Sequence, residues 1–162
     1  MFYGKAVDPT MITSMSEIAS QKSAPMKQVK KLLDYCASQE DAIMTLQKSD
    51  MKLVGHSDTG YLKKPKAYSR SGGGGFMSNS FLLPPNNGAV LTISKIIKSV
   101  MLSVVEAELC ALFFNTKKDL HMRQILEDIG HKQDQTLMQK DNSTAEEVIK
   151  KRSNQNVPRA WI

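Results

Sequence analysis

The sequence predicts an α/β fold in which a mixed sheet is flanked by helices. Three observations lead to this class: helical periodicity in the first third of the chain, short strand-like segments with turn signals in the middle, and a long amphipathic segment followed by one more strand and helix. With 162 residues, of which 41% are hydrophobic, the chain has the size and apolar content of one domain with a core of its own.

Two helices are expected near the N-terminus. Residues 11–19 have a short helical pattern, and a polar break covers residues 20–25. Residues 26–37 carry the stronger signal, because their apolar side chains recur at the i, i+3, i+4, i+7 spacing of an amphipathic helix: Val29, Leu32, Leu33 and Cys36.

The middle of the chain predicts strands. Residues 42–46 and 51–55 have strand patterns separated by a turn. Four consecutive glycines lie inside a further strand pattern at residues 71–78, which indicates a bulge or the close approach of another part of the chain. A Pro-Pro-Asn-Asn-Gly turn at residues 84–88 then leads into a β-branched strand over residues 89–93.

A long helix is expected over residues 104–129, ended by Gly130. Residues 136–139 then predict a short strand, and a last helix ends near residue 153. The buried face that the apolar pattern assigns to the long helix consists of Leu102, Val105, Leu109, Leu112, Phe113 and Leu120.

The net charge of +6 is concentrated in one segment. Residues 1–50 hold six lysines and six acids, and residues 103–162 hold nine bases and nine acids. Residues 51–102 hold seven bases against one acid, Asp58. A basic stretch of this kind suits a polyanion such as a nucleic-acid backbone, although a solvated lysine-rich hairpin explains it equally well. The candidates for phosphate contact are Lys63, Lys64, Lys66 and Arg70.

Composition also limits location and redox chemistry. No run of residues reaches the length of a membrane-spanning helix, and the N-terminus lacks the pattern of a signal peptide. We therefore expect an intracellular protein, cytoplasmic or nuclear, with no membrane partner. Cys36 and Cys110 lie inside apolar helical patterns, which favours reduced core thiols over a disulfide or a zinc site.

Three carboxylates are candidates for a metal site: Asp58, Glu108 and Asp141. They are separated by 50 and 33 residues, and each is expected where an apolar strand ends or on the long helix. Acids brought together from separate strands and helices are how proteins hold a pair of hard divalent cations against a phosphate. This arrangement makes phosphodiester cleavage the leading hypothesis.

Each acid also has a structural explanation. Asp58 suits a turn, because Ser-Asp-Thr-Gly is favourable turn chemistry. Glu106 and Glu108 compete for the position on the helix, and the helical wheel does not choose between them, since they lie on either side of the apolar face. Asp141 precedes residues that can cap the last helix. His56, two residues before Asp58, is expected to be structural.

Four short motifs follow one another between residues 55 and 145. They are Gly-His-Ser-Asp-Thr-Gly-Tyr at residues 55–61, Pro-Pro-Asn-Asn-Gly-Ala-Val-Leu-Thr-Ile at 84–93, Ser-Val-Val-Glu-Ala-Glu-Leu-Cys-Ala-Leu at 103–112 and Lys-Asp-Asn-Ser-Thr-Ala at 140–145. Together with a lysine-rich helix at residues 26–35, they resemble the end of the reverse transcriptase and the ribonuclease H domain of copia-type retrotransposon polyproteins. Four motifs in the right order are more specific than any one of them.

The resemblance implies a ribonuclease-H-like mixed sheet flanked by helices, C-terminally truncated, with a short helical N-terminal appendage. Residues 1–48 would then be a remnant of the reverse-transcriptase connection region, residues 49–153 the ribonuclease-H-like domain, and residues 154–162 a polar tail. The resemblance also selects Glu108 over Glu106 as the metal-binding glutamate, because Glu108 directly precedes Leu-Cys-Ala-Leu.

The resemblance further implies a reaction. Two Mg²⁺ or Mn²⁺ ions would be held by Asp58, Glu108 and Asp141, one ion activating a water and the other stabilising the leaving 3′-oxygen. The RNA strand of an RNA–DNA hybrid would be hydrolysed, with basic residues on the phosphates and the 2′-hydroxyl marking the RNA. The hybrid, and other parts of the retroelement polyprotein, are the expected partners.

The chain departs from the family after its last helix. Family members continue to a motif with a histidine and a fourth aspartate, whereas residues 150–162 contain no acid and no histidine. We therefore expect an incomplete two-ion site and reduced or lost nuclease activity. The alternatives are an inactive remnant that still binds nucleic acid through residues 52–98, and a retroelement fragment with no selected function.

Overall fold

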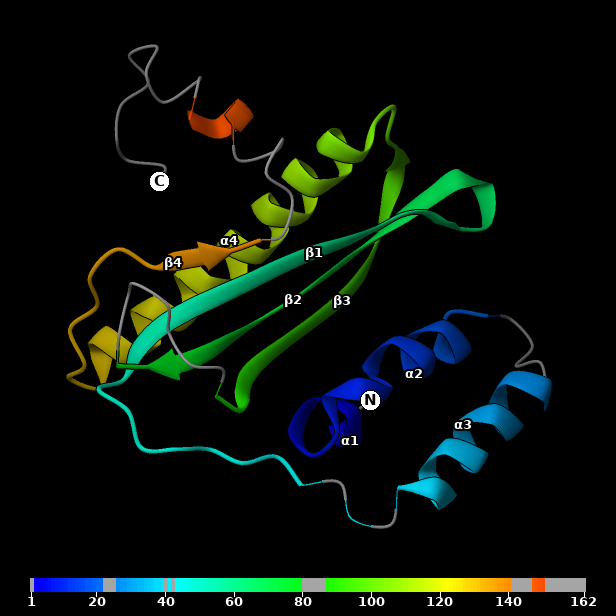
Figure 1. Cartoon of the computed structure of the whole chain (residues 1–162), viewed down its shortest axis with the longest axis horizontal. Helices are drawn as coiled ribbons and strands as arrows, with labels where there is room; N and C mark the ends of the chain where they lie inside the picture. Colours follow the sequence, from blue (N-terminus) through cyan, green and yellow to red (C-terminus); the bar gives the residue numbers. More distant parts are fainter. Residues whose placement is uncertain are drawn as a thin grey trace.

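Four strands form one mixed sheet with helices around it, which confirms the predicted α/β class (Figure 1). The structure is a computed structural model that describes residues 2–21, 26–39, 41, 43–79, 87–140 and 147–150. Among these residues, no helix has the length and apolarity needed to cross a membrane.

The sheet has the order β3-β2-β1-β4. The first three strands, β1 (Lys52–Lys64), β2 (Tyr68–Ser78) and β3 (Ala89–Val100), form an antiparallel meander. The last strand, β4 (Leu137–Gln139), returns beside β1 in the parallel direction and pairs with residues 54–56. A long crossover connection must carry the chain from β3 to β4, because these strands run in the same direction at opposite edges of the sheet.

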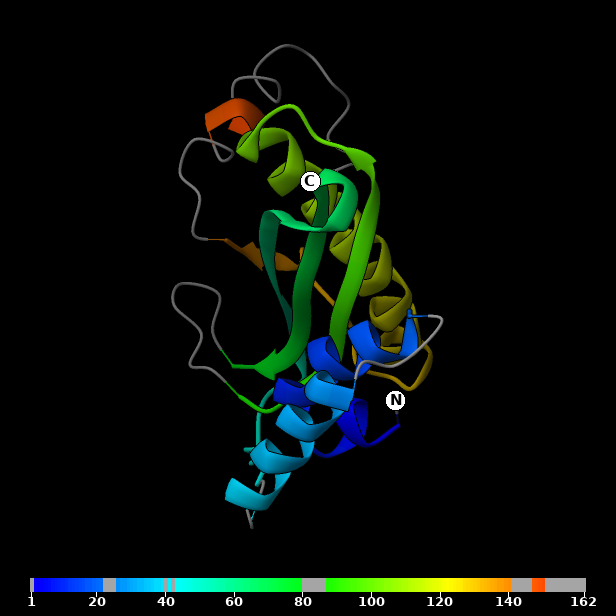
Figure 2. The ribbon, with the colours of Figure 1, turned by 90° about the vertical axis from the view of Figure 1, so that its right-hand side faces the viewer.

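That crossover is α4 (Val104–Asp128), close to the expected range of 104–129. Ser103 caps its N-terminus, since the Ser103 hydroxyl accepts a hydrogen bond from the Glu106 amide at 3.1 Å. Its C-terminus is a Schellman turn, in which Gly130 has φ +93° and the His131 amide donates to the Leu126 carbonyl at 2.8 Å. Figure 2 shows α4 lying along the sheet.

The N-terminal third forms α1 (Phe2–Ala6), a 3-10 turn (Pro9–Met11), α2 (Ile12–Ala19) and α3 (Met26–Ser38). The helices expected over 11–19 and 26–37 are thus confirmed to within a residue. These helices gather on the β3 side of the sheet, away from β4 (Figure 1). Among these helices α2 makes the most contact with a strand, a small contact with β3.

Two small apolar clusters hold α4 to the sheet. One contains Leu53, Met77 and Leu126, near the C-terminal end of α4. The other, near the N-terminal end, contains Ile97, Met101 and Ala107, with Cys110 and Phe114 packed against it. The region between the clusters is lined by glycine, serine, Asn115 and Asp119 rather than by large apolar side chains.

The buried face of α4 differs from the prediction. The residues that it buries are Ala107, Glu108, Ala111, Asn115, Asp119 and Leu126. Phe113 and Leu120, which the apolar pattern placed inside, are 62% and 51% exposed, and Leu102 before the helix is 89% exposed. The prediction was wrong because the facing strands offer hydroxyl groups and glycine backbone, which accommodate polar side chains in place of large apolar ones.

Three strand predictions also need correction. A strand was expected over residues 42–46, but the described residues 43–46 are not in a strand and their Ile43 and Leu46 side chains are exposed, because no strand of the described residues pairs with them. The next strand was expected to end at residue 55, but β1 continues to Lys64. Asp58 therefore lies inside a strand rather than at its end. β3 likewise runs on to Val100, beyond the expected end at residue 93.

The glycine run in β2 permits a close approach, as the sequence indicated. A Cβ on Gly73 would overlap the Asn115 amide and lie 2.6 Å from the His56 carbonyl oxygen. A Cβ on Gly55, in the neighbouring strand, would lie 2.5 Å from a carboxylate oxygen of Asp119. α4 can therefore place two polar side chains directly against the backbone of β1 and β2.

Gly73→Ala should destabilise the protein by about 3 kcal/mol or more, because the new methyl group has no room between α4 and β1. Gly72→Ala is the matched control in the same strand, since its nearest neighbour would be the Asp58 carbonyl oxygen at 3.8 Å. Urea unfolding of both variants measures the difference. Equal midpoints for the two variants would contradict the close packing described above.

Candidate metal site and nucleic-acid surface

Asp58 is exposed in the middle of β1, paired across the ladder with Gly72 of β2. Its neighbours Ser57 and Thr59 both contact α4: Ser57 accepts from the Asn115 amide at 2.7 Å, and Thr59 donates to the Ala107 carbonyl at 3.2 Å. Because side chains alternate along a strand, Asp58 points to the face of the sheet turned away from α4.

Glu108 lies in the second turn of α4 and is only 6% exposed. The hydrogen bond from Thr59 to Ala107 joins the residues directly beside Asp58 and Glu108. β1 and α4 are therefore in contact beside Asp58 and Glu108, which are 50 residues apart in the sequence. Their side chains start from different sides of β1, one exposed and one buried.

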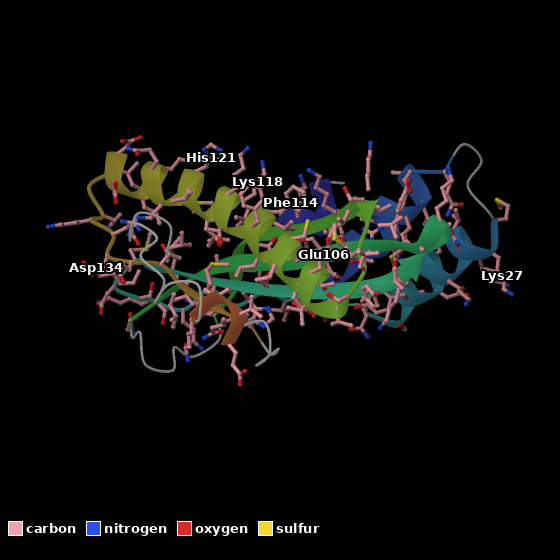
Figure 3. The ribbon with its side chains drawn as sticks, turned by 90° about the horizontal axis from the view of Figure 1, so that it is seen from above. Lys27, Glu106, Phe114, Lys118, His121 and Asp134 are labelled. Atoms are coloured by element: carbon pink, nitrogen blue, oxygen red, sulfur yellow. The ribbon has the colours of Figure 1, made fainter. Side chains whose placement is uncertain are left out.

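Glu106 has a separate structural role. One of its carboxylate oxygens accepts a hydrogen bond from the Leu102 amide at 2.7 Å, while its own amide donates to Ser103. These reciprocal bonds resemble a capping box and hold the first turn of α4. Figure 3 shows Glu106 toward the N-terminal end of the helix, with Phe114, Lys118 and His121 following along it. This role distinguishes Glu106 from the buried Glu108.

Asp141, the third predicted metal ligand, lies outside the residues that the structure describes. The strand that leads to it is described, and it pairs Gln139 with His56 in parallel register. In sequence, Asp58 follows His56 by two residues and Asp141 follows Gln139 by two. His56 itself is exposed on β1.

The donor chemistry of these acids suits Mg²⁺ or Mn²⁺, which prefer carboxylate oxygens. Within the described ranges no three His, Cys, Asp or Glu side chains are grouped as for one ion. That finding does not bear on the predicted triad, because Asp141 lies outside the described residues. Asp58, Glu108 and Asp141 remain the predicted ligands.

The four predicted phosphate-binding residues fall into two pairs. Lys63 and Lys66 are exposed at the tip of the β1–β2 hairpin, where Lys66 has φ +63° in the turn Pro65–Ala67. Lys64 and Arg70 are instead directed at α2, and both form ion pairs with Glu17. Arg70 is 6% exposed. The hairpin thus exposes Lys63 and Lys66 to solvent, whereas Lys64 and Arg70 lie against α2.

Sequence reasoning missed Asn115 and Asp119, which fill the middle of the α4–sheet interface. Asn115 is 1% exposed; its amide donates to Ser57 Oγ and to the Gly72 carbonyl at 2.7 and 2.8 Å, and its carbonyl accepts from Ser71 at 3.4 Å. A signal was present: Glu108, Asn115 and Asp119 recur at helical spacing, opposite a run of glycines.

Asp119 is the least satisfied of these groups. It is 2% exposed, and neither carboxylate oxygen has a hydrogen-bond partner among the described residues. Burial raises the pKa of Asp119 to about 7, because desolvation penalises the charged form. The carboxyl group therefore holds its proton across much of the acidic range.

A cavity of about 370 Å³ lies elsewhere, between α2 and α3. Its walls include Thr10, Ile18, Leu32 and Tyr35, together with Glu17 and Lys31. None of the predicted metal ligands or phosphate-binding residues lines it.

Comparisons of the chain with models of protein families, with curated proteins and with solved structures found no match.

Because Asp119 keeps its proton in the folded state, its contribution to the free energy of unfolding should be larger in acid than at neutral pH. The folded chain keeps the proton up to about pH 7, whereas the unfolded chain loses it near pH 4, so the folded state binds more protons between those values. Stability should therefore fall as the pH rises from about 4 to about 7, by up to about 4 kcal/mol.

Asp119→Asn should remove this part of the pH dependence, and Asp128→Asn, which changes an exposed acid of the same helix, should keep it. The measurement is urea unfolding of the three proteins at a series of pH values. If the wild-type and Asp119→Asn curves ran parallel from pH 4 to pH 7, the buried carboxyl would not be titrating as described.

Proposed function

We propose that the protein is a metal-dependent endonuclease of the ribonuclease H type, derived from a retrotransposon polyprotein and directed at the RNA strand of RNA–DNA hybrids. The observation that carries the proposal is the contact between β1 and α4, in which Thr59 bonds to Ala107 beside the two candidate acids. Acids on separate elements can serve one site only if those elements meet, and here they do.

The order of the elements supports a ribonuclease-H-like fold. The motif at residues 55–61 lies on β1, the apolar end of the motif at 84–93 begins β3, and the motif at 103–112 begins α4 with Ser103 as its cap. The strand that precedes the fourth motif is β4. The described parts of these motifs therefore lie on the kinds of element that the resemblance implies.

The parallel register of β1 and β4 supports the grouping of Asp58 with Asp141. β1 and β4 run in the same direction, and His56 and Gln139 are their last paired residues. In the sequence, Asp58 follows His56 by two residues and Asp141 follows Gln139 by two. β4 ends at Gln139, whereas β1 continues past Asp58 to Lys64, so Asp58 lies just beyond the stretch of β1 that pairs with β4.

The protein's own residues would bind and orient the substrate. Asp58, Glu108 and Asp141 would hold Mg²⁺ or Mn²⁺, which supplies an activated water and charge stabilisation when bound. The exposed hairpin lysines Lys63 and Lys66 would contact the phosphate backbone. The fourth acid of the family has no counterpart in residues 150–162.

The second candidate function is a binding module that retains the nucleic-acid surface without cleavage. The exposed bases of the β1–β2 hairpin favour it, because phosphate contact needs charge and access but no complete metal site. The two candidates share a substrate and differ in whether its RNA strand is cut.

Cleavage of a labelled RNA–DNA hybrid in Mg²⁺ or Mn²⁺ separates the two functions. The wild-type protein should cut the RNA strand, and Asp58→Asn, Glu108→Gln and Asp141→Asn should each lower the rate by at least about 100-fold. Loss of a residue that only orients a metal ligand already lowers activity by up to about 100-fold, and loss of the ligand itself should lower it at least as much. Glu106→Gln is the matched control, since glutamine can also close the capping box.

Cleavage that survives all three acid substitutions would exclude the metal mechanism. Absence of cleavage by the wild-type protein, with salt-sensitive binding of the hybrid, would favour the binding module. Loss of activity in Glu106→Gln equal to that in Glu108→Gln would contradict the assignment of different roles to the two glutamates.

A further inference from the structure

Glu17 of α2 lies against two of the bases that were expected to bind phosphate. Its carboxylate forms an ion pair with the Lys64 ammonium group and lies 3.8 Å from Nη2 of Arg70. Around this pair, Arg70 Nη1 donates to Ser94 Oγ at 2.9 Å and to Ser16 Oγ at 3.5 Å. A single carboxylate therefore meets cations from β1 and β2, and Ser94 of β3 contacts one of these cations.

The cluster of Lys64, Arg70 and Ser94 has more donors than α2 satisfies. Nε and Nη2 of Arg70 are buried and have no hydrogen-bond partner among the described residues. Leaving guanidinium donors buried and unfilled is unfavourable, and a planar guanidinium is suited to bind an anion with two parallel hydrogen bonds. Glu17, at 3.8 Å, gives Arg70 charge without a hydrogen bond. A phosphate, with more acceptor oxygens, would use the donors more fully.

Polar contacts join α2 to the sheet. Besides the Glu17 pairs, a 3.0 Å hydrogen bond joins Thr13 Oγ1 to Ser94 Oγ. Glu17 also lines the cavity between α2 and α3, and Lys31 lines that same cavity. Lys64 and Arg70 do not line it, so Glu17 borders open space that these two bases do not share.

We propose that Lys64, Arg70 and Ser94 form a phosphate-binding surface that α2 covers, with the Glu17 carboxylate occupying the place of a backbone phosphate. The inference rests on the proposed function, because it takes an RNA–DNA hybrid as the polyanion. Binding of the hybrid then requires α2 to withdraw Glu17, so the N-terminal helices act as an intramolecular competitor. Lys63 and Lys66 remain accessible throughout and make the first contact.

The first test compares Glu17→Gln with Asp34→Asn by fluorescence anisotropy of a labelled hybrid without divalent cations. Each variant loses one negative charge, but Asp34 is exposed on α3, outside the cluster. Glu17→Gln should tighten binding by about tenfold at low salt. Because it frees two bases, it should also steepen the plot of log K against log [salt] by up to about 2, at about 0.9 per phosphate. Asp34→Asn should do neither.

A second variant checks that the gain comes from the uncovered bases. Lys64→Gln should change binding by less than about twofold in the wild-type protein, where Lys64 is already paired, and should reverse much of the gain when combined with Glu17→Gln. A gain that persists in the double variant would overturn the proposed surface. Circular dichroism and thermal unfolding of each variant show that the fold is kept.

A disulfide tests the movement of α2 directly. Thr13→Cys with Ser94→Cys, in a Cys36→Ser, Cys110→Ser background, places two thiols where the present hydroxyls are 3.0 Å apart. The oxidised protein should bind the hybrid more weakly and with a shallower salt dependence than the reduced protein. Equal binding in both states would show that α2 does not compete.

The outcomes separate this inference from the proposed function. If the wild-type protein binds or cleaves the hybrid but Glu17→Gln behaves like Asp34→Asn, competition by α2 is excluded and the nuclease proposal stands. If neither the wild-type protein nor Glu17→Gln binds the hybrid even at low salt, both proposals fail.

Discussion

The contact between Asn115 and the glycine-lined centre of the sheet is the constraint on which the rest of the structure depends. The Asn115 amide bonds to a side chain of β1 and to the backbone of β2, so α4 is fixed to two strands at once. Fully satisfied buried polar groups specify one alignment, whereas apolar packing tolerates several. The glycines make the alignment possible, because any Cβ at Gly73 would occupy the space of the amide. The two apolar clusters then form on either side of this fixed point.

The alignment of α4 determines the position of the candidate site. Once Asn115 is held over Ser57, Ala107 lies two helical turns earlier and meets Thr59 two residues further along β1. Asp58 and Glu108 are placed beside that second contact. Asp119, one turn in the other direction, is carried into the same interface, where it has no hydrogen-bond partner among the described residues and where burial raises its pKa. The alignment of α4 therefore accounts both for the position of Asp58 and Glu108 and for the burial of the Asp119 carboxyl group.

The basic surface depends on a different contact, between α2 and the β1–β2 hairpin. The sequence places the excess of positive charge in residues 51–102. In the folded chain Glu17, from residues 1–50 with no net charge, pairs with two of these bases, Lys64 and Arg70. An ion pair of this kind, half-buried and sensitive to salt, contributes little to stability. It can nevertheless decide which bases a polyanion meets, because competition depends on access as well as on binding strength. The N-terminal helices and the candidate nuclease region are thus linked through charge.

The sequence by itself determined the α/β class, the bounds of α2, α3 and α4, and the concentration of positive charge after Asp58. These follow from local periodicity, from the Ser103 cap and Gly130 stop of α4, and from composition, all of which act over a few residues. It did not determine the face that α4 buries, the length of β1 around Asp58, or the sequestering of Lys64 and Arg70. The tertiary structure decided those, because burial of a side chain depends on what the opposing surface offers. Here that surface is glycine backbone, serine hydroxyls and a glutamate 47 residues before its lysine partner.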